Sequence, residues 1–114
     1  MPSIGVDCEE VGRFREKAND KAFLKKIYTE REVHYCESKP NPEQHLAARF
    51  AGKEAVIKAL QGLNMEVAFS QIEILNDNKG RPYVKIQNLK NLEVKISLTH
   101  TRELAIAFAL AEKA

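Results

Sequence analysis

The sequence predicts an α+β domain in which an antiparallel sheet packs against one long central helix. Three observations lead to this prediction. A strand pattern covers residues 3–11, helical patterns follow as far as residue 62, and from residue 67 the apolar period changes to two. Strands and helices that are segregated along a chain in this way are typical of α+β folds. A length of 114 residues fits one domain, covering residues 1–114.

Composition and charge restrict the classes of function. The net charge of +2 is weak for a dedicated nucleic-acid-binding domain, and 44% hydrophobic residues give only a modest core. Cys8 and Cys36 lack metal-ligand spacing, so we expect two free thiols. We find no signal peptide and no apolar run near 18 residues, so we expect a cytoplasmic protein that does not bind membranes.

The first strand, residues 3–11, has two different faces. Its apolar face holds Ile4, Val6 and Cys8. Its other face holds Gly5, Asp7 and Glu9. The apolar face fits a half-buried strand. Asp7 and Glu9 either form an ordinary solvated face or hold a hard cation such as Mg²⁺, which prefers carboxylate oxygens.

Three short helical segments follow the first strand. Residues 12–19 are basic and surround one aromatic side chain, with Arg13, Phe14, Arg15 and Lys17. This surface is either an ordinary charged helix or a docking surface for an acidic protein. Residues 22–28 are also predicted to be helical. Thr29 and Glu32 form a capping box that begins another helix, and residues 39–42, Lys-Pro-Asn-Pro, end it.

Residues 45–60 are predicted to belong to one long helix that starts with Pro42 and Glu43 and that Gly62 ends. An apolar stripe of Leu46, Phe50, Ile57 and Leu60 lies opposite a face of five alanines. A helix that is apolar on both sides is normally buried, yet this one carries Arg49, Lys53, Glu54 and Lys58. Glu54 and Lys58 form either an internal i,i+4 ion pair or part of a ligand site.

The remaining residues are predicted to form antiparallel strands. Residues 69–75 and 82–86 flank a turn at 76–80 and make a hairpin. Residues 92–100 alternate as a strand, with His100 on the apolar face. Residues 104–111 are apolar on both faces, which predicts a strand that is central or covered on both sides.

Four segments carry a resemblance to a known family. They are Ile4-Gly5-Val6-Asp7 followed by Glu10, Val11, Arg13 and Phe14; the run from His45 to Ala59; Gly80-Arg81-Pro82; and Ser97-Leu98-Thr99-His100-Thr101. In this order and at these spacings, the chain resembles holo-acyl-carrier-protein synthases, the short form of the 4′-phosphopantetheinyl transferase superfamily. The resemblance covers nearly the whole chain and implies the fold of that superfamily.

The resemblance implies a reaction. The family transfers the 4′-phosphopantetheine group of coenzyme A to a serine of an apo acyl carrier protein and releases adenosine 3′,5′-bisphosphate, a step of fatty acid biosynthesis and lipid metabolism. It implies that Asp7 and Glu54 hold Mg²⁺ (Mn²⁺ is a possible substitute). Glu9, an acid where short members usually have an uncharged residue, is a third candidate ligand. Glu54 is the candidate base, and Lys58 is expected to meet the phosphates of coenzyme A.

The resemblance also implies binding residues and partners. Coenzyme A contacts are expected at Arg49, Lys53, Lys58, Gly80, Arg81, Pro82, Ser97, His100 and Thr101. His45 is a further candidate for the phosphates, while Arg49 and Lys53 are equally candidates for structural pairing. Arg13, Phe14, Arg15 and Lys17 match the place where the family docks the acidic carrier protein. Short members are homotrimers with active sites between subunits, which agrees with the modest core and the doubly apolar last strand.

One segment departs from the family, and two other functions compete. Residues 61–66 contain one glycine and an acid, where many members have two glycines and a basic or aromatic residue. This departure supports an alternative, a non-catalytic module of the same fold that binds a carrier protein or a nucleotide. The presence of Asp7, Glu54 and Lys58 favours the transferase. A basic nucleic-acid-binding domain is disfavoured by the weak charge and by the lack of interleaved aromatic residues.

Overall fold

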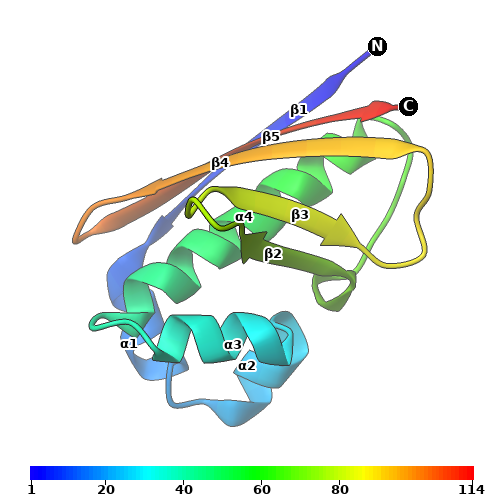
Figure 1. Cartoon of the computed structure of the whole chain (residues 1–114). Coiled ribbons are helices and arrows are strands. Elements are labelled where there is room, and N and C mark those ends of the chain that lie inside the picture. Colours follow the sequence, from blue (N-terminus) through cyan, green and yellow to red (C-terminus); the bar gives the residue numbers. More distant parts are fainter.

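The computed structural model describes residues 1–114 and confirms the α+β prediction (Figure 1). A sheet lies on one side of the long helix, and the shorter helices gather around the first turns of that helix. The strands are β1 (Ser3–Glu10), β2 (Ile72–Asn76), β3 (Pro82–Ile86), β4 (Leu92–His100) and β5 (Leu104–Lys113). The helices are α1 (Phe14–Lys17), α2 (Lys21–Ile27), α3 (Glu30–Glu37) and α4 (Pro42–Gln61). No helix has the length and apolar character needed to cross a membrane.

The sheet is antiparallel and has β5 at its centre. The strand order is β1-β5-β4, with Asp7 opposite Ala107 and His100 opposite Ala105, while β2 and β3 form a separate two-stranded sheet. The prediction of a central last strand is therefore confirmed. Its four alanines, Ala105, Ala107, Ala109 and Ala111, are fully buried, and the face that carries them packs against α4.

The other face of this sheet is apolar and exposed. Val6 of β1 is 56% exposed, and Ile106 and Phe108 of β5 are 40% and 43% exposed. We name this surface the outer sheet face; it consists of Ile4, Val6, Leu104, Ile106 and Phe108. The expectation that the apolar side of β1 is its buried side is therefore wrong. The buried side is the one that carries Gly5, Asp7 and Glu9, because that side faces α4.

Close packing of β1 on α4 places the carboxylates beside the helix. A Cβ atom added to Gly5 would lie 2.1 Å from the backbone oxygen of Ala55 and 2.9 Å from the backbone nitrogen of Ala59. Only glycine permits this approach, because any side chain would overlap the helix backbone. The alanine face of α4 is the matching surface. Two residues after Gly5, Asp7 therefore lies next to Glu54 and Lys58 of α4.

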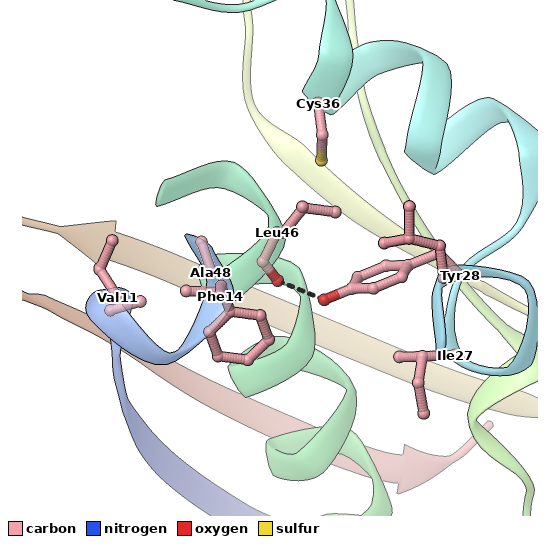
Figure 2. Close-up of a cluster of buried hydrophobic side chains, with 10 residues drawn as sticks. Val11, Phe14, Ile27, Tyr28, Cys36, Leu46 and Ala48 are labelled. Carbon is pink, nitrogen blue, oxygen red and sulfur yellow. Dashed lines mark hydrogen bonds between the residues drawn. The ribbon is translucent and has the colours of Figure 1, made fainter. Parts of the chain in front are cut away.

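The shorter helices close a second core against the first half of α4 (Figure 2). The Tyr28 hydroxyl donates a hydrogen bond of 2.8 Å to the Leu46 carbonyl, which is the dashed line in Figure 2. Phe14 is 2% exposed and its ring lies 5.4 Å from that of Phe50. The expectation that Phe14 is an exposed docking residue is wrong, since it belongs to this core.

Most element boundaries agree with the predictions. Helix α4 begins at Pro42, as predicted, because proline is tolerated at the first helical position. It ends at Gly62, as predicted, although Gly62 is right-handed at φ −64°, and the left-handed residue is Asn64 at φ 60°. The capping box of Thr29 and Glu32 is present. Residues Phe69–Gln71 form a 3-10 turn before β2 instead of the start of a strand.

Candidate active site

Three carboxylates meet where β1 crosses α4. We name Asp7, Glu9 and Glu54 the acidic cluster. Burial raises the pKa of Glu9 to about 7, and the hydrogen bond and charge of Asp7 add to this effect. Burial, and then the charge of Asp7, also raise the pKa of Glu54. The Oδ2 atom of Asp7 is buried without a hydrogen-bond partner. The cluster is thus rich in negative charge, which the neighbouring cations Lys58 and Arg13 offset only in part.

Lys58 is the cation nearest to the acidic cluster. Its ammonium group donates to the Val6 carbonyl at 3.0 Å and lies 3.6 Å from Asp7 Oδ1. The internal ion pair between Glu54 and Lys58 is not among the ion pairs of the structure, although the charge of Lys58 lowers the pKa of Glu54. Lys58 therefore bridges from α4 to β1, and its side chain remains 49% exposed.

A second group of charges lies near the start of α4. Arg49 is 3% exposed, its guanidinium donates to the Asn76 side chain, and it lies 4.2 Å from the centre of the Tyr35 ring. The rings of His45 and His100 meet edge to face at 5.2 Å. Lys39 approaches Tyr35 at 4.8 Å. We name Lys39, His45, Arg49 and His100 the basic cluster. Arg49 and His100, predicted separately, are thereby brought into one group.

The acidic and basic clusters lie toward opposite edges of the sheet. Asp7 belongs to β1 and His100 to β4, and these are the two edge strands. On α4, Arg49 and Glu54 are separated by about 140° around the helix and by about 7.5 Å along it. The two clusters of one chain thus face different directions. A single ligand that contacts both would have to span this distance or lie between two copies of the chain.

Lys53 is a structural residue. Its side chain is fully buried, its ammonium group lies 2.7 Å from Glu32 Oε1, and it donates to the carbonyls of Ile27, Phe69 and Ile72. An ammonium group has three protons, and these four oxygens use all of them. The expectation that Lys53 binds coenzyme A is therefore contradicted, and its alternative, structural pairing, is the arrangement in the structure.

The hairpin residues form a turn that is linked to the basic cluster. Gly80 is left-handed at φ 82°, and Arg81 pairs with Asp77 at 3.3 Å ahead of Pro82, the first residue of β3. The Asn76 side chain donates to the Gly80 carbonyl and accepts a hydrogen bond from Arg49. Gly80, Arg81 and Pro82 therefore sit on a loop that Asn76 ties to Arg49.

The residues of the last predicted motif, 97–101, do not all face the same part of the structure. Ser97 is exposed on the side of β4 opposite to that of Leu98 and His100, because side chains alternate along a strand. Thr101 accepts hydrogen bonds from the amides of Glu103 and Leu104 and so shapes the turn between β4 and β5. Within one chain, only His100 of this motif joins the basic cluster.

The predicted carrier-docking segment is a basic surface without an exposed aromatic ring. Arg13 is 63% exposed in side chain and pairs with Glu9 at 3.5 Å. Arg15 is also exposed, and Lys17 covers the Phe23 ring at 4.4 Å. Because Arg13 touches Glu9, this basic surface directly adjoins the acidic cluster.

A sequence model of the 4′-phosphopantetheinyl transferase superfamily matches residues 3–109. The chain belongs to this superfamily. The family resemblance seen in the sequence is thereby confirmed. Among similar proteins are holo-[acyl-carrier-protein] synthases of Chloroherpeton thalassium, 40% identical, and of Chlorobaculum tepidum, 44% identical. Each alignment covers 96% of this chain, and 96% and 97% of the respective relatives.

A solved structure agrees with these relatives. The holo-(acyl-carrier-protein) synthase of Bacillus anthracis, in complex with CoA (3′,5′-ADP), superposes with a TM-score of 0.83 at 33% identity. The match covers 98% of this chain and 96% of that one. The predicted phosphopantetheinyl transferase fold and the predicted enzyme class are both confirmed by these matches.

Three residues of the site were missed by the sequence analysis. Tyr35 and Asn76 contact Arg49, and Lys39 lies over the Tyr35 ring, but each comes from a segment predicted only as helix, loop or turn. Neither spacing nor periodicity links these segments to the long helix. Asn76 beside a turn gives only a turn signal, and Tyr35 carries no signal for cation binding.

Proposed function

We propose that the chain is a single transferase domain, residues 1–114, that moves the 4′-phosphopantetheine group of coenzyme A to a serine of an apo acyl carrier protein. The observation that carries this proposal is the meeting of Asp7, Glu9, Glu54 and Lys58 between β1 and α4 in a chain of this superfamily. The printed names of its relatives support the substrate and the carrier protein. The cytoplasm, where coenzyme A is available, is the proposed location.

The acidic cluster fits a divalent cation. The unpartnered Oδ2 of Asp7, and the pKa values of Glu9 and Glu54 that burial and neighbouring carboxylates raise, indicate negative charge that Lys58 and Arg13 neutralise only in part. No group of three or more His, Cys, Asp or Glu side chains holds the geometry of a complete metal site. Mg²⁺ usually takes one or two carboxylates and completes its shell with water and substrate phosphates. We therefore assign Asp7 and Glu54 as ligands, with Glu9 as third, and bound Mg²⁺ would neutralise the pyrophosphate.

The reaction exchanges one phosphorus–oxygen bond for another. The carrier serine Oγ attacks the phosphorus nearest the pantetheine, and the bond from that phosphorus to the bridging oxygen breaks. Glu54 is the proposed acceptor of the serine proton, because a carboxylate within reach of the attacking hydroxyl can act as a general base. Lys58 carries an ammonium group that can stabilise the negative charge of the departing adenosine 3′,5′-bisphosphate.

The active site is proposed to lie between subunits of a homotrimer. The acidic and basic clusters face different edges of the sheet, so a second copy that supplies its basic cluster completes the site without stretching the ligand. The outer sheet face supports association, since Ile106, Phe108 and their neighbours form an exposed apolar surface of the kind that marks interfaces. Ser97, on the same face of the sheet, would then approach coenzyme A from the neighbouring copy.

The carrier protein is proposed to dock on Arg13, Arg15 and Lys17. This basic surface adjoins the acidic cluster through the Arg13–Glu9 contact, so a serine beside an acidic carrier helix would arrive next to Asp7. Exposed charges at the edge of an interface mainly speed the association of the two proteins. The KM for the carrier protein should therefore rise with salt concentration, while kcat changes little.

Mass spectrometry of an apo carrier protein tests the proposal. Incubation with coenzyme A, Mg²⁺ and the chain should add one phosphopantetheine, and chelation of Mg²⁺ should stop the addition. Asp7→Asn and Glu54→Gln should reduce the rate by at least about 100-fold, the lower range for removing a positioned group. Arg81→Gln is a control remote from these carboxylates and should keep the same Mg²⁺ requirement.

The non-catalytic module is the alternative, and the departure at residues 61–66 favours it. That segment contains Gly62 next to Ser3 and the left-handed Asn64. Binding of coenzyme A without any mass gain of the carrier protein, over hours and with Mg²⁺ present, would establish the alternative.

A further inference from the structure

Arg13 is the one basic residue of the proposed docking surface that already has a carboxylate partner. Its guanidinium lies 3.5 Å from Glu9 Oε1, whereas neither Arg15 nor Lys17 takes part in an ion pair. This contact joins two parts of the molecule, because Arg13 belongs to the docking surface and Glu9 to the acidic cluster. Any partner that draws Arg13 away from Glu9 therefore changes the charge of the acidic cluster.

The backbone on both sides of Arg13 is held in place, while its side chain is largely exposed. Val11 is 1% and Phe14 is 2% exposed, and the Val11 amide donates to the Glu103 carbonyl at 2.8 Å. The Arg13 side chain is 63% exposed, and that of Glu9 only 11%. An ion pair with one exposed partner contributes little to stability, so separating it costs little. Arg13 can therefore change partners by turning its side chain, without any movement of the fold.

Glu9 lies between a carboxylate and a cation that act on it in opposite directions. Burial, and then Asp7, raise the pKa of Glu9, whereas Arg13 lowers it. Asp7 is an assigned Mg²⁺ ligand, so one side of Glu9 adjoins the proposed metal site and the other side adjoins the docking surface. The positive charge of Arg13 offsets part of the negative charge that would attract a cation to the cluster.

An acidic carrier protein offers Arg13 a second carboxylate. We propose that Arg13 couples carrier docking to Mg²⁺ binding, because it pairs with Glu9 in the free chain and with a carboxylate of the docked carrier protein. This exchange leaves the charge of Glu9 to the cation. The inference rests on the proposed function, and it gives Arg13 and Glu9 a joint regulatory role that the transfer reaction itself does not require.

The coupling should be modest and should act in both directions. We expect about a fivefold effect, the lower end of the range for two coupled sites, because only one exposed ion pair is exchanged. Coupling between binding sites is reciprocal, so Mg²⁺ should tighten carrier binding by the same factor as the carrier tightens Mg²⁺ binding. Salt screens the exposed guanidinium, so both effects should decrease as the salt concentration rises.

Titration with Mn²⁺ in the absence of coenzyme A tests the coupling without any turnover. The ion is added to the natural chain, Arg13→Gln and Glu9→Gln, each with and without a saturating apo carrier protein. Electron paramagnetic resonance measures the concentration of free Mn²⁺. A pH above the Glu9 pKa of about 7 keeps this carboxylate ionised. Arg15→Gln is the matched control, since Arg15 is exposed on the same surface and has no carboxylate partner.

The variants should separate the effect of Arg13 from that of carrier docking alone. In the natural chain and in Arg15→Gln, the carrier protein should tighten Mn²⁺ binding about fivefold. Arg13→Gln should bind Mn²⁺ about fivefold more tightly than the natural chain when no carrier is present, and the carrier should add nothing further. Glu9→Gln should also lose the effect of the carrier, because Arg13 then has no carboxylate to release.

Two results would overturn the inference. One is equal Mn²⁺ affinity of the natural chain and Arg13→Gln without the carrier, and the other is an equal effect of the carrier on both proteins. Mass spectrometry of the carrier protein keeps the inference separate from the proposed function. Coupling that depends on Arg13 in a chain that never transfers phosphopantetheine would refute the proposed function alone, whereas transfer without such coupling would refute the inference alone.

Discussion

Replacing Lys53 with methionine tests the structural role of this buried ammonium group. Lys53 and Glu32 are both fully buried and 2.7 Å apart. Removing one partner of a buried ion pair typically costs about 3–5 kcal/mol, because the other charge remains uncompensated. Glu32 keeps hydrogen bonds from the amides of Thr29 and Ile74 in the variant, which places the expected loss near the lower value, about 3 kcal/mol.

Urea unfolding at a fixed protomer concentration measures this loss, since association also contributes to stability. Lys26→Met removes an exposed lysine and should change the free energy of unfolding by no more than about 0.5 kcal/mol. In the double variant Glu32→Gln with Lys53→Met, the loss should be at least about 1 kcal/mol smaller than the sum of the single losses, because no charge is left unpaired.

Two results would refute the reasoning on Lys53. A loss below about 1 kcal/mol, similar to that of Lys26→Met, would mean that the pair contributes little. Unchanged stability together with a higher KM for coenzyme A would mean that Lys53 binds coenzyme A and has no structural role. The second result would also require the ammonium group to leave the four oxygens that surround it.

Three further predictions follow from packing and protonation. Gly5→Ala should lower the free energy of unfolding by about 1–3 kcal/mol and reduce the rate of phosphopantetheine transfer, because its Cβ would overlap the Ala55 carbonyl. The control is Gly12→Ala, where an added Cβ makes only an ordinary van der Waals contact. Folded Glu9 has a pKa of about 7 against its ordinary value of 4.5, so the folded state retains a proton that the unfolded state releases. The free energy of unfolding should fall as pH rises from 4.5 to 7, and Glu9→Gln should flatten this fall; equal slopes in urea unfolding of both proteins would contradict it. Phe14→Ala should lose about 3–5 kcal/mol by urea unfolding, whereas Arg15→Ala should stay within about 0.5 kcal/mol and raise the KM for the carrier protein; a stable Phe14→Ala would contradict the core position.

The sequence predicted the elements well because their signals are local. The alternation of residues 92–100, the capping box at Thr29 and the alanine face of the long helix each depend on residues within a few positions of one another. The resemblance also predicted that Asp7 and Glu54 belong to one site, although they lie 47 positions apart in the sequence. Local patterns and the family motifs together therefore located the sheet, the helix and the acidic cluster.

The errors concern which side of an element faces the protein. Strand β1 has an apolar face and an acidic face, and elementary patterning favours burial of the apolar one. The structure buries the acidic face because Gly5 and the alanines of α4 permit close packing there. Phe14 was misassigned for a related reason, and the choice between a ligand role and structural pairing stayed open for Lys53. Their partners, Phe50 and Glu32, come from segments whose proximity no local period encodes.

The pairing of β1 with β5 has a consequence for folding during synthesis on the ribosome. Ser3 pairs with Ala111, and β5 also separates β1 from β4, so the three-stranded sheet needs a strand that is synthesised long after β1. Synthesis proceeds at about 5–20 residues per second, so β1 waits several seconds for its partner. During that interval the sheet that holds Asp7 against α4 has not yet formed. Such long-range pairing slows folding, and the nascent chain exposes its apolar strand to chaperones until β5 emerges.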